Sequence, residues 1–294
     1  MPVVICFVNM KGGVGKTTLC VNLAFEIFSR RKKVLIVDND PQFSATSALL
    51  RPQFYIDRYI TKRDYLTIYD IYENPPRIRG TKQEKNDPQQ FFMTPWYMKS
   101  EPEIVLDLIA SRIELYETLR NPSHKEYCLA KFLEKYAKKY DYIFIDCPPT
   151  PSVLTYSAFA ASDYAIIPVT PNYFSTMGLP QFLGTLTDFK ERLHDPKEIS
   201  PLGVVFTNVE RQITSETSRA MDRVRHALKE DYPDEIPVFE AKMSHFKVYE
   251  KTLWQSVPVQ KISGPGTRGK SHAVFELRCI ADEMDRNIAL RKGR

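Results

Sequence analysis

Short runs of β-branched and apolar residues recur along the chain, and between them apolar residues return every three or four positions. The first pattern predicts strands buried on both faces, and the second predicts amphipathic helices. The expected strands are residues 3–8, 34–37, 104–109, 142–145, 164–168 and 202–207. This alternation predicts an α/β fold: a doubly wound, mainly parallel sheet flanked by helices.

The first helix is expected over residues 17–31, where Leu19, Leu23 and Ile27 lie four positions apart. The basic residues 30–33 come at its C-terminal end, which the helix dipole favours. A glycine-rich segment separates this helix from the first strand. The loop is therefore expected at a strand end and a helix start.

Residues 74–102 break the alternation, because they are rich in proline and charge. We expect one domain over residues 1–294 with an insertion at about 74–102. The interpretation we favour is a surface insertion whose aromatic residues pack onto the domain, and the alternative is a docking element for a partner. The aromatic residues are Phe91, Phe92, Trp96 and Tyr97.

The composition narrows the class of protein. With 294 residues, 43% of them hydrophobic, the chain can bury a substantial core. Its formal net charge of +5 suggests a polyanionic partner, although an excess of lysine also occurs on ordinary solvated surfaces. The five cysteines form no C-x-x-C pair, and the first apolar run is too short to span a bilayer. We therefore expect a soluble cytoplasmic protein without a zinc site or disulfide framework.

The segment KGGVGKTT is a variant of the phosphate-binding loop G-x-x-x-x-G-K-[ST], with Met10 at the first glycine position. Small glycines let successive backbone N–H groups surround phosphate oxygens. Lys16 is expected to neutralise the β and γ phosphates and Thr17 to ligate Mg²⁺. A glycine turn that binds nothing is the alternative. The expected ATP-binding residues are Lys11, Gly12, Gly13, Val14, Gly15, Lys16, Thr17 and Thr18.

Aspartates end two of the expected strands. VLIVDNDPQ supplies Asp38 and Asp40, and YIFIDCPPT supplies Asp146. Carboxylates at the C-terminal ends of strands lie in the crevice where doubly wound sheets bind ligands. We expect Asp146 to hold Mg²⁺ through its water shell and Asp40 to lie near the metal and orient the attacking water. Turn or helix-cap roles are the alternative for such residues.

KGGVGKTT, VDNDPQ and IDCPPT, in this order, resemble the deviant Walker A, Walker A-prime and Walker B motifs of the ParA/MinD ATPase family. The resemblance continues through IPVTPNYFSTMGL and GVVFTNVERQ and is closest to the ParA branch. It implies that Lys11 crosses a dimer interface to the nucleotide of the other subunit and acts in catalysis beside Lys16 and Asp40. It also matches Asn208 to an adenine-contacting residue, for which a loop-capping asparagine is the alternative.

The resemblance implies an ATP-dependent partition ATPase. Its ATP-bound sandwich dimer would bind DNA without sequence preference, and a cargo-linked, ParB-like adaptor would stimulate hydrolysis and release. This implies a cytoplasmic, nucleoid-associated protein. With no room before the first strand for a helix-turn-helix domain, we do not expect operator-specific binding. The alternatives are a MinD-like membrane ATPase and a protein-interaction switch. The apolar stripe from Phe275 through Leu277, Ile280 and Met284 to Ile288 is expected to pack on the core rather than on a membrane.

The chain departs from the family pattern in two places. DPQFSAT places Phe43 and Ser44 where many ParA proteins have glycine and asparagine. The late segment has Lys242, Met243 and Ser244 in place of an Ile-Pro-Arg run. The first departure bears on the mobility of the loop and on the hydrolysis rate.

The basic residues expected to contact DNA lie mainly in one predicted helix, TSETSRAMDRVRHALKE. Its apolar stripe is Met221, Val224 and Leu228, and Ser215 and Ser218 are its expected caps. An ordinary solvated helix is the alternative. The candidate DNA contacts are Arg219 and Arg223 one turn apart, then Arg225, Arg268 and Lys270.

Overall fold

The computed structural model describes residues 1–73, 87–172, 178–193, 199–231, 236–265 and 267–293. Within them, one sheet has the strand order β3-β4-β2-β5-β1-β6-β7. All neighbouring strands pair in parallel except β3 and β4. The strands are β1 Val3–Phe7, β2 Val34–Asp38, β3 Met93–Met98, β4 Glu101–Ile109, β5 Tyr142–Asp146, β6 Tyr164–Val169 and β7 Ser200–Phe206.

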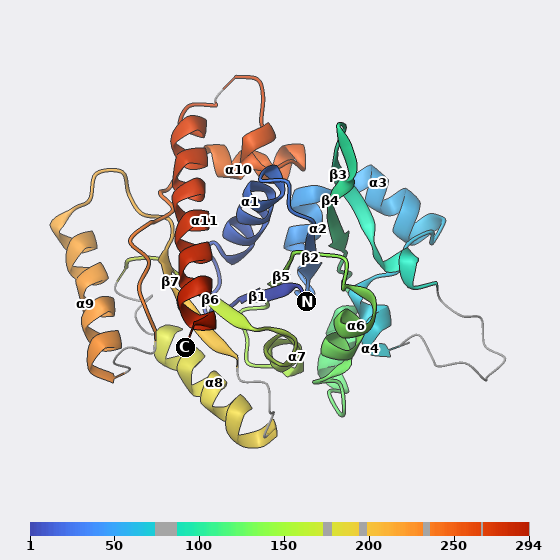
Figure 1. The fold of residues 1–294 in the computed structure, drawn as a ribbon, viewed down its shortest axis with the longest axis horizontal. Coiled ribbons are helices and arrows are strands. Elements are labelled where there is room, and N and C mark those ends of the chain that lie inside the picture. Colours follow the sequence, from blue (N-terminus) through green and yellow to red (C-terminus); the bar gives the residue numbers. More distant parts are fainter. Residues whose placement is uncertain (74–86, 173–177, 194–198, 232–235, 266, 294) are drawn as a thin grey trace.

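Helices cover both faces of this sheet (Figure 1). One face packs against α1 Lys16–Ser29, α2 Ser44–Leu49, α3 Pro52–Tyr55, the π-helical turn Ile56–Thr61, α10 Val248–Gln255, the 3-10 turn Val259–Lys261 and α11 Lys270–Lys292. The other packs against α4 Ile68–Glu73, the 3-10 turn Pro88–Phe91, α5 Leu115–Arg120, α6 Cys128–Tyr136, α7 Val153–Ala161, α8 Gly178–Leu193 and α9 Ser215–Asp231. The predicted doubly wound α/β fold is confirmed.

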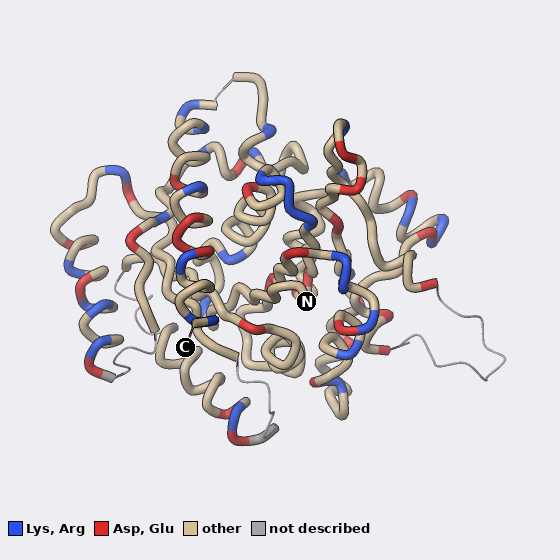
Figure 2. Tube along the Cα trace, viewed as in Figure 1, with Lys and Arg blue, Asp and Glu red and all other residues tan. Residues whose placement is uncertain are grey.

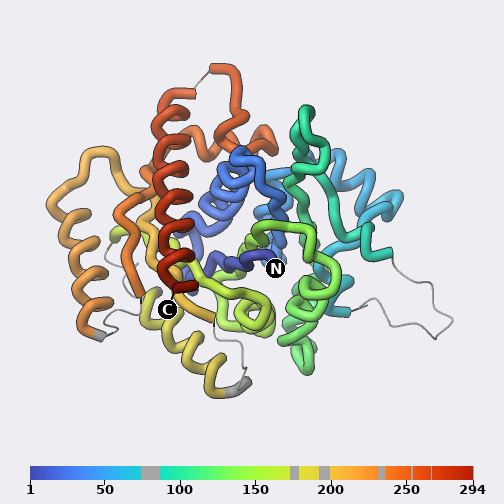
Figure 3. The backbone as a smooth tube through the Cα atoms, viewed as in Figure 1, coloured from blue at the N-terminus to red at the C-terminus, as the bar shows by residue number. Residues whose placement is uncertain are grey.

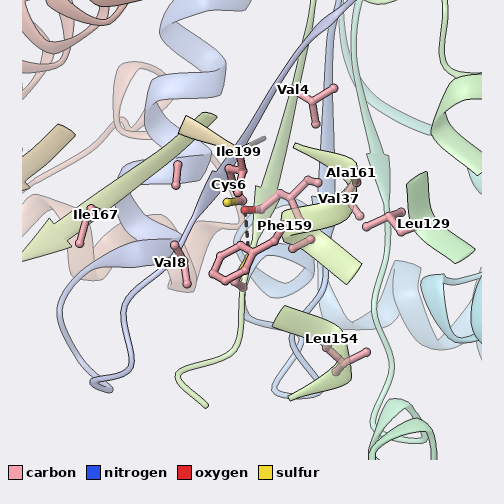
Figure 4. Close-up of a cluster of buried hydrophobic side chains, with 14 of the residues drawn as sticks. Val4, Cys6, Val8, Val37, Leu129, Leu154, Phe159, Ala161, Ile167 and Ile199 are labelled. Carbon is pink, nitrogen blue, oxygen red and sulfur yellow. Dashed lines mark hydrogen bonds between the residues drawn. The ribbon is translucent and has the colours of Figure 1, made fainter. Parts of the chain in front are cut away.

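The alternation of side chains along β1 produces two hydrophobic cores. Cys6 and Val8 point into the core on the α7 side, where Figure 4 shows them beside Phe159. Ile5 and Phe7 point into the opposite core, on the α1 side. Because both sets of side chains are fully buried, the strand is an unbroken apolar run in the sequence. A one-residue register slip would exchange the two sets, so packing fixes the register.

Helix α1 follows the predicted pattern, with Leu19, Leu23 and Ile27 buried. It ends at Ser29, so the basic residues 30–33 lie beyond its last turn. Arg30 instead forms a 2.7 Å ion pair with Asp282 of α11. This contact fastens the end of α1 to the long helix that covers it.

The structure revises the prediction for the segment 74–102. Residues 74–86 lie outside the described residues, but β3 and the start of β4 fall inside this range and belong to the sheet. Figure 3 shows these two antiparallel strands side by side at one side of the molecule. Phe91 and Phe92 are buried, and the Trp96 ring lies edge-on to Phe25 at 5.5 Å. Tyr97 is 57% exposed, so packing onto the domain is wrong for that residue.

Helix α11 buries most of its predicted apolar stripe against the α1 side of the sheet. Leu277, Ile280, Met284 and Ile288 are buried, as predicted. Phe275 is 64% exposed and faces away from this core, so its inclusion in the stripe is wrong. Among the described residues, none of the helices combines the length and apolar character that crossing a membrane requires.

Candidate nucleotide-binding site

The glycine-rich loop joins β1 to α1 at the C-terminal edge of the sheet. Gly13 and Gly15 have φ angles of 75° and 78°, in the left-handed region that glycine adopts most readily. A Cβ atom on Gly15 would also lie 3.3 Å from the Met243 Cε. Gly12 has neither restriction, so the structure requires glycine at the second and third of the loop glycines only.

Two residues that directly follow β7 form hydrogen bonds with this loop. The Thr207 hydroxyl donates a 2.6 Å hydrogen bond to the Val14 carbonyl oxygen. Asn208, with φ 52°, donates from its side-chain amide to the Gly13 carbonyl oxygen at 3.3 Å. The predicted adenine-contacting residue thus lies against the loop, while its contact with adenine stays a prediction.

The two lysines of the loop lie in different environments. Lys16 is buried, and its Nζ donates to the Lys11 carbonyl oxygen at 3.0 Å. Burial lowers the pKa of the Lys16 ammonium, and the nearby Asp146 and Asp40 carboxylates oppose this shift. Lys11 is half-buried, and its Nζ donates to the side-chain oxygen of Asn172 at 3.3 Å. The Lys16 ammonium therefore lies inside the loop. The Lys11 ammonium instead extends to the segment that follows β6.

Asp146, the last residue of β5, lies beside the first turn of α1. Its Oδ2 accepts a 2.6 Å hydrogen bond from the Thr17 hydroxyl. Its Oδ1 is buried without a hydrogen-bond partner. Burial, and then the Asp38 carboxylate, raise the pKa of Asp146 well above its usual range, while Thr17 and Lys16 oppose the shift. An unpartnered carboxylate oxygen beside a threonine hydroxyl is a suitable donor set for Mg²⁺, which prefers oxygen ligands.

Asp38 has a structural contact that the sequence did not indicate. It pairs in register with Asp146 across β2 and β5, and it is fully buried. Its Oδ2 accepts hydrogen bonds of 2.7 Å from both the N–H and the hydroxyl of Thr46. Burial raises the pKa of Asp38 to about 7. The residue fixes the start of α2 and adds a third carboxylate to the site.

Asp40 lies on the loop between β2 and α2. Its Oδ1 accepts a 2.9 Å hydrogen bond from the Gln42 N–H, and its carbonyl oxygen accepts one of 2.8 Å from the Ser111 hydroxyl. Burial raises the pKa of the carboxyl, whereas the Gln42 N–H and the Lys16 charge lower it. Lys16 thus interacts electrostatically with both Asp40 and Asp146, so the structure brings all three predicted residues together.

Sequence reasoning missed several polar residues that hold the site. Ser111 supports Asp40, and Asn9 donates to the Pro168 carbonyl oxygen at 2.7 Å while accepting from the Lys11 N–H. Asn39 donates to the Leu154 carbonyl oxygen at 2.8 Å. Each lies within two residues of a strand end. A polar residue at that position was therefore the available signal.

The expected DNA-contacting helix forms as α9, with Met221, Val224 and Leu228 buried. Arg219 and Arg223 are exposed one turn apart. The N-terminal cap differs from the prediction: the Thr214 hydroxyl accepts a 3.1 Å hydrogen bond from the Thr217 N–H, so neither predicted serine is the cap. Figure 2 shows acidic and basic segments alternating along this helix.

Of the other three candidate DNA contacts, Arg225 and Lys270 are engaged in contacts within the chain. The Arg225 guanidinium lies 5.4 Å from the centre of the Phe206 ring and pairs with Asp222 at 3.2 Å. Lys270 donates to the Ile262 carbonyl oxygen at 2.8 Å, which leaves Arg268 as the exposed cation of its loop. This loop and α9 lie in different parts of the molecule in Figure 1.

The comparison with known proteins decides the family. A family model described as an AAA domain matches residues 3–199. The chromosome partitioning protein ParA of Myxococcus xanthus is 34% identical over 219 residues, which cover 72% of this chain and 69% of that protein. The chain belongs to the ParA/Soj family of partition ATPases.

Two further comparisons agree with this membership. The sporulation initiation inhibitor protein Soj of Bacillus subtilis is 34% identical over 204 residues, which cover 69% of this chain and 72% of that protein. Cobyrinic acid a,c-diamide synthase from Mycobacterium smegmatis, with a bound ATP analogue and magnesium, superimposes with a TM-score of 0.72. That match covers 100% of this chain and 97% of the synthase at 22% identity, and it shows that the fold is shared.

Proposed function

We propose that this ParA/Soj-family chain is a Mg²⁺-dependent ATPase that positions cargo through an ATP-dependent homodimer. The observation that carries the proposal is the separation of the two loop lysines. Lys16 lies inside the loop among Asp146 and Asp40, while Lys11 reaches over the rim to Asn172. We assign Lys16 to a nucleotide bound to its own chain and Lys11 to contact with a second chain, and the different environments of the two lysines support this division.

The residues of the loop would bind ATP as follows. Backbone N–H groups from Gly12 to Thr18, at the N-terminus of α1, would surround the phosphates. Lys16 neutralises the β and γ phosphates. Thr17 and Asp146 would hold Mg²⁺, which supplies charge stabilisation at the phosphates when bound. The unpartnered Oδ1 of Asp146 supports this assignment, and so does the magnesium-bound synthase with the same fold.

Asp40 is assigned to orient the attacking water. Its carboxylate lies in the field of Lys16, and its backbone is fixed by Ser111. A carboxylate held in place in this way keeps the water aligned with the phosphate that it attacks. Asn208 is assigned to the adenine base, because its amide already lies against the loop.

Lys11 is assigned to the nucleotide of a second chain. A cation that reaches the phosphates only in the dimer makes assembly depend on ATP. The arginines Arg219 and Arg223 of α9, duplicated in such a dimer, are assigned to DNA phosphates, with Arg268 as a further contact. A ParB-like or other cargo adaptor would stimulate hydrolysis and release. These assignments predict a nucleoid-associated protein in the cytoplasm.

The experiment measures dimerisation and DNA binding with ATP, with ADP and without nucleotide. Size-exclusion chromatography with light scattering should show a dimer with Mg²⁺ and ATP and a monomer otherwise. Fluorescence anisotropy should show binding to unrelated DNA fragments with ATP only. Equal DNA binding in all three nucleotide conditions would reject the switch. ATP-dependent binding to anionic vesicles in place of DNA would favour the MinD-like alternative.

A further inference from the structure

Phe43 has a backbone conformation that an aromatic residue rarely adopts. Its φ and ψ are both 41°, in the left-handed region that glycine occupies readily. Its N–H donates a 2.9 Å hydrogen bond to the Asp40 carbonyl oxygen, and its own carbonyl accepts from the Ser47 N–H at 3.0 Å. The strained residue therefore closes the turn that begins at Asp40 and starts α2. Such strain persists only where the surroundings hold it.

A stack of aromatic rings holds Phe43 in this conformation. Its ring lies parallel to that of Tyr55, with centroids 6.2 Å apart and an interplanar angle of 5°. Tyr55 stacks on Tyr59 at 5.0 Å, and Tyr59 stacks on Tyr65 at 5.4 Å. Tyr59 is buried in the core on the α1 side. The turn after Asp40 is thus anchored in the packed interior.

Hydrogen bonds return from this stack to Asp40. The Tyr55 hydroxyl donates to the Ser111 carbonyl oxygen at 2.9 Å, and the Ser111 hydroxyl donates to the Asp40 carbonyl oxygen at 2.8 Å. The Asp40 carbonyl accepts from the Phe43 N–H as well. The four residues form a closed circuit of contacts around the backbone of Asp40.

We propose that Phe43 and Tyr55 are positioning residues for ATP hydrolysis, which act by fixing the Asp40 carboxylate relative to Lys16. This inference rests on the proposed role of Asp40. A ring in place of glycine removes freedom from the loop, so the carboxylate is already placed before nucleotide binds. Displacement of a reacting group by about 1 Å can reduce a rate on the order of 10²-fold.

The test compares variants of the full chain with Mg²⁺ and ATP. Phe43→Gly and Tyr55→Leu should each lower kcat about tenfold or more. This is within the loss of about 10²-fold that displacement of the Asp40 carboxylate can cause. The affinity for a fluorescent ATP analogue should change by less than about twofold, because the phosphate-binding groups are untouched. Phe43→Tyr keeps the ring and should restore most of the turnover. Tyr97→Leu, at an exposed aromatic residue of β3, is the matched control and should leave kcat unchanged.

Two further measurements separate positioning from folding. Glycine suits a φ of 41°, so Phe43→Gly should remain folded by circular dichroism while its turnover falls. In an Asp40→Ala background, the Phe43→Gly change should cause no further loss, because no carboxylate is left to position. If Phe43→Gly lowers turnover equally in the Asp40→Ala background, the inference is wrong. It is also wrong if Asp40→Ala is slow while Phe43→Gly turns over ATP like wild type. Both outcomes leave the proposed role of Asp40 intact. Wild-type turnover of Asp40→Ala would overturn the proposed role of Asp40 and the inference with it.

Discussion

The Thr17 hydroxyl and the Asp146 carboxylate are joined by a 2.6 Å hydrogen bond between the first turn of α1 and the end of β5. The bond fixes one carboxylate oxygen and leaves the other buried without a partner. A buried carboxylate oxygen without a partner is costly unless a cation or donor meets it. The two side chains assigned to the metal therefore lie side by side.

Asp146→Asn should weaken the dependence of ATP turnover on Mg²⁺. Asparagine keeps an oxygen for the Thr17 hydroxyl but removes the charge that attracts the metal. The Mg²⁺ concentration for half-maximal turnover should rise on the order of tenfold, the scale of a single charge interaction. Asp107→Asn, at a buried strand aspartate bonded to Tyr140 and Thr94, is the control, and it should leave the metal dependence unchanged. A wild-type Mg²⁺ profile for Asp146→Asn would remove Asp146 from the metal site.

Lys16→Ala and Lys11→Ala should have different effects. The first removes the cation inside the loop, so nucleotide binding should be abolished. The second should keep nucleotide binding but abolish ATP-dependent dimerisation and turnover, since its cation is assigned to the partner's phosphates. Titration with a fluorescent ATP analogue and light scattering measure the two properties separately. An equal fall in nucleotide affinity in both variants would refute the division of roles.

The double variant Arg219→Ala/Arg223→Ala should bind unrelated DNA fragments more weakly. A cation that neutralises a phosphate releases counterions, so the slope of log affinity against log salt should flatten by about one for each arginine that binds a phosphate. Dimerisation with ATP should survive. Lys131→Ala/Lys135→Ala on α6 removes the same charge at the same spacing and is the control. If both double variants weaken DNA binding equally, net charge rather than α9 accounts for binding.

The nucleotide-free chain should become less stable as the pH rises toward neutrality. Asp38 titrates near pH 3.8 when unperturbed and at about 7 in the fold, so the folded chain binds a proton more tightly than the unfolded chain between these values. The contribution of this proton to the free energy of unfolding is fully present below pH 3.8, and it is lost as the pH rises through 7. Urea unfolding should show a decline of up to about 1.4 kcal/mol per pH unit for each such proton. Asp38→Asn should flatten the decline, and a free energy of unfolding that rises with pH would contradict the assignment.

Gly203→Ala should destabilise the fold on the order of 1–3 kcal/mol, because overpacking and backbone strain act together. The residue has φ 149°, and an added Cβ would lie 2.7 Å from the Pro237 carbonyl oxygen and 2.8 Å from the Phe239 ring. Gly184→Ala in α8 is the matched control, because nothing lies within 4 Å of its Cβ position. Thermal unfolding should show a lower Tm for the first variant only. A Tm equal to that of wild type would show that β7 relaxes to accept the methyl group.

The parallel strands could be predicted because burial on both faces makes each an apolar run. Strand β3 could not, because it lies at the sheet edge, where one side needs no partner and Pro95 is tolerated. Its Thr94 and half-exposed residues therefore resemble a loop in the sequence. Sequence reasoning missed this strand because proline argues against a strand only where both neighbours must be paired, whereas the insertion itself stays a prediction.

The phosphate-binding loop could be predicted because its chemistry depends on neighbours in sequence. The contact between Ser111 and Asp40 could not be predicted, because the two residues lie 71 positions apart: a polar residue after a strand end marks Ser111 as a candidate but does not identify its partner. The same reason accounts for Arg225: its contact with Phe206 depends on how α9 packs against β7. Motifs locate the groups that act on a ligand, whereas the groups that hold them in place require the three-dimensional structure.

The hydrogen bond from Thr207 to the Val14 carbonyl joins the loop to the end of β7, and α9 begins eight residues further on, at Ser215. If the loop shifts when its occupant changes, it must either break this bond and the neighbouring contact of Asn208 or carry the end of β7 with it. The first course leaves the buried Thr207 hydroxyl unpaired, which is costly. The second moves the segment that leads to the arginines Arg219 and Arg223. Hydrogen bonds thus connect the phosphate-binding loop to the segment that leads to the helix assigned to DNA, within a single chain.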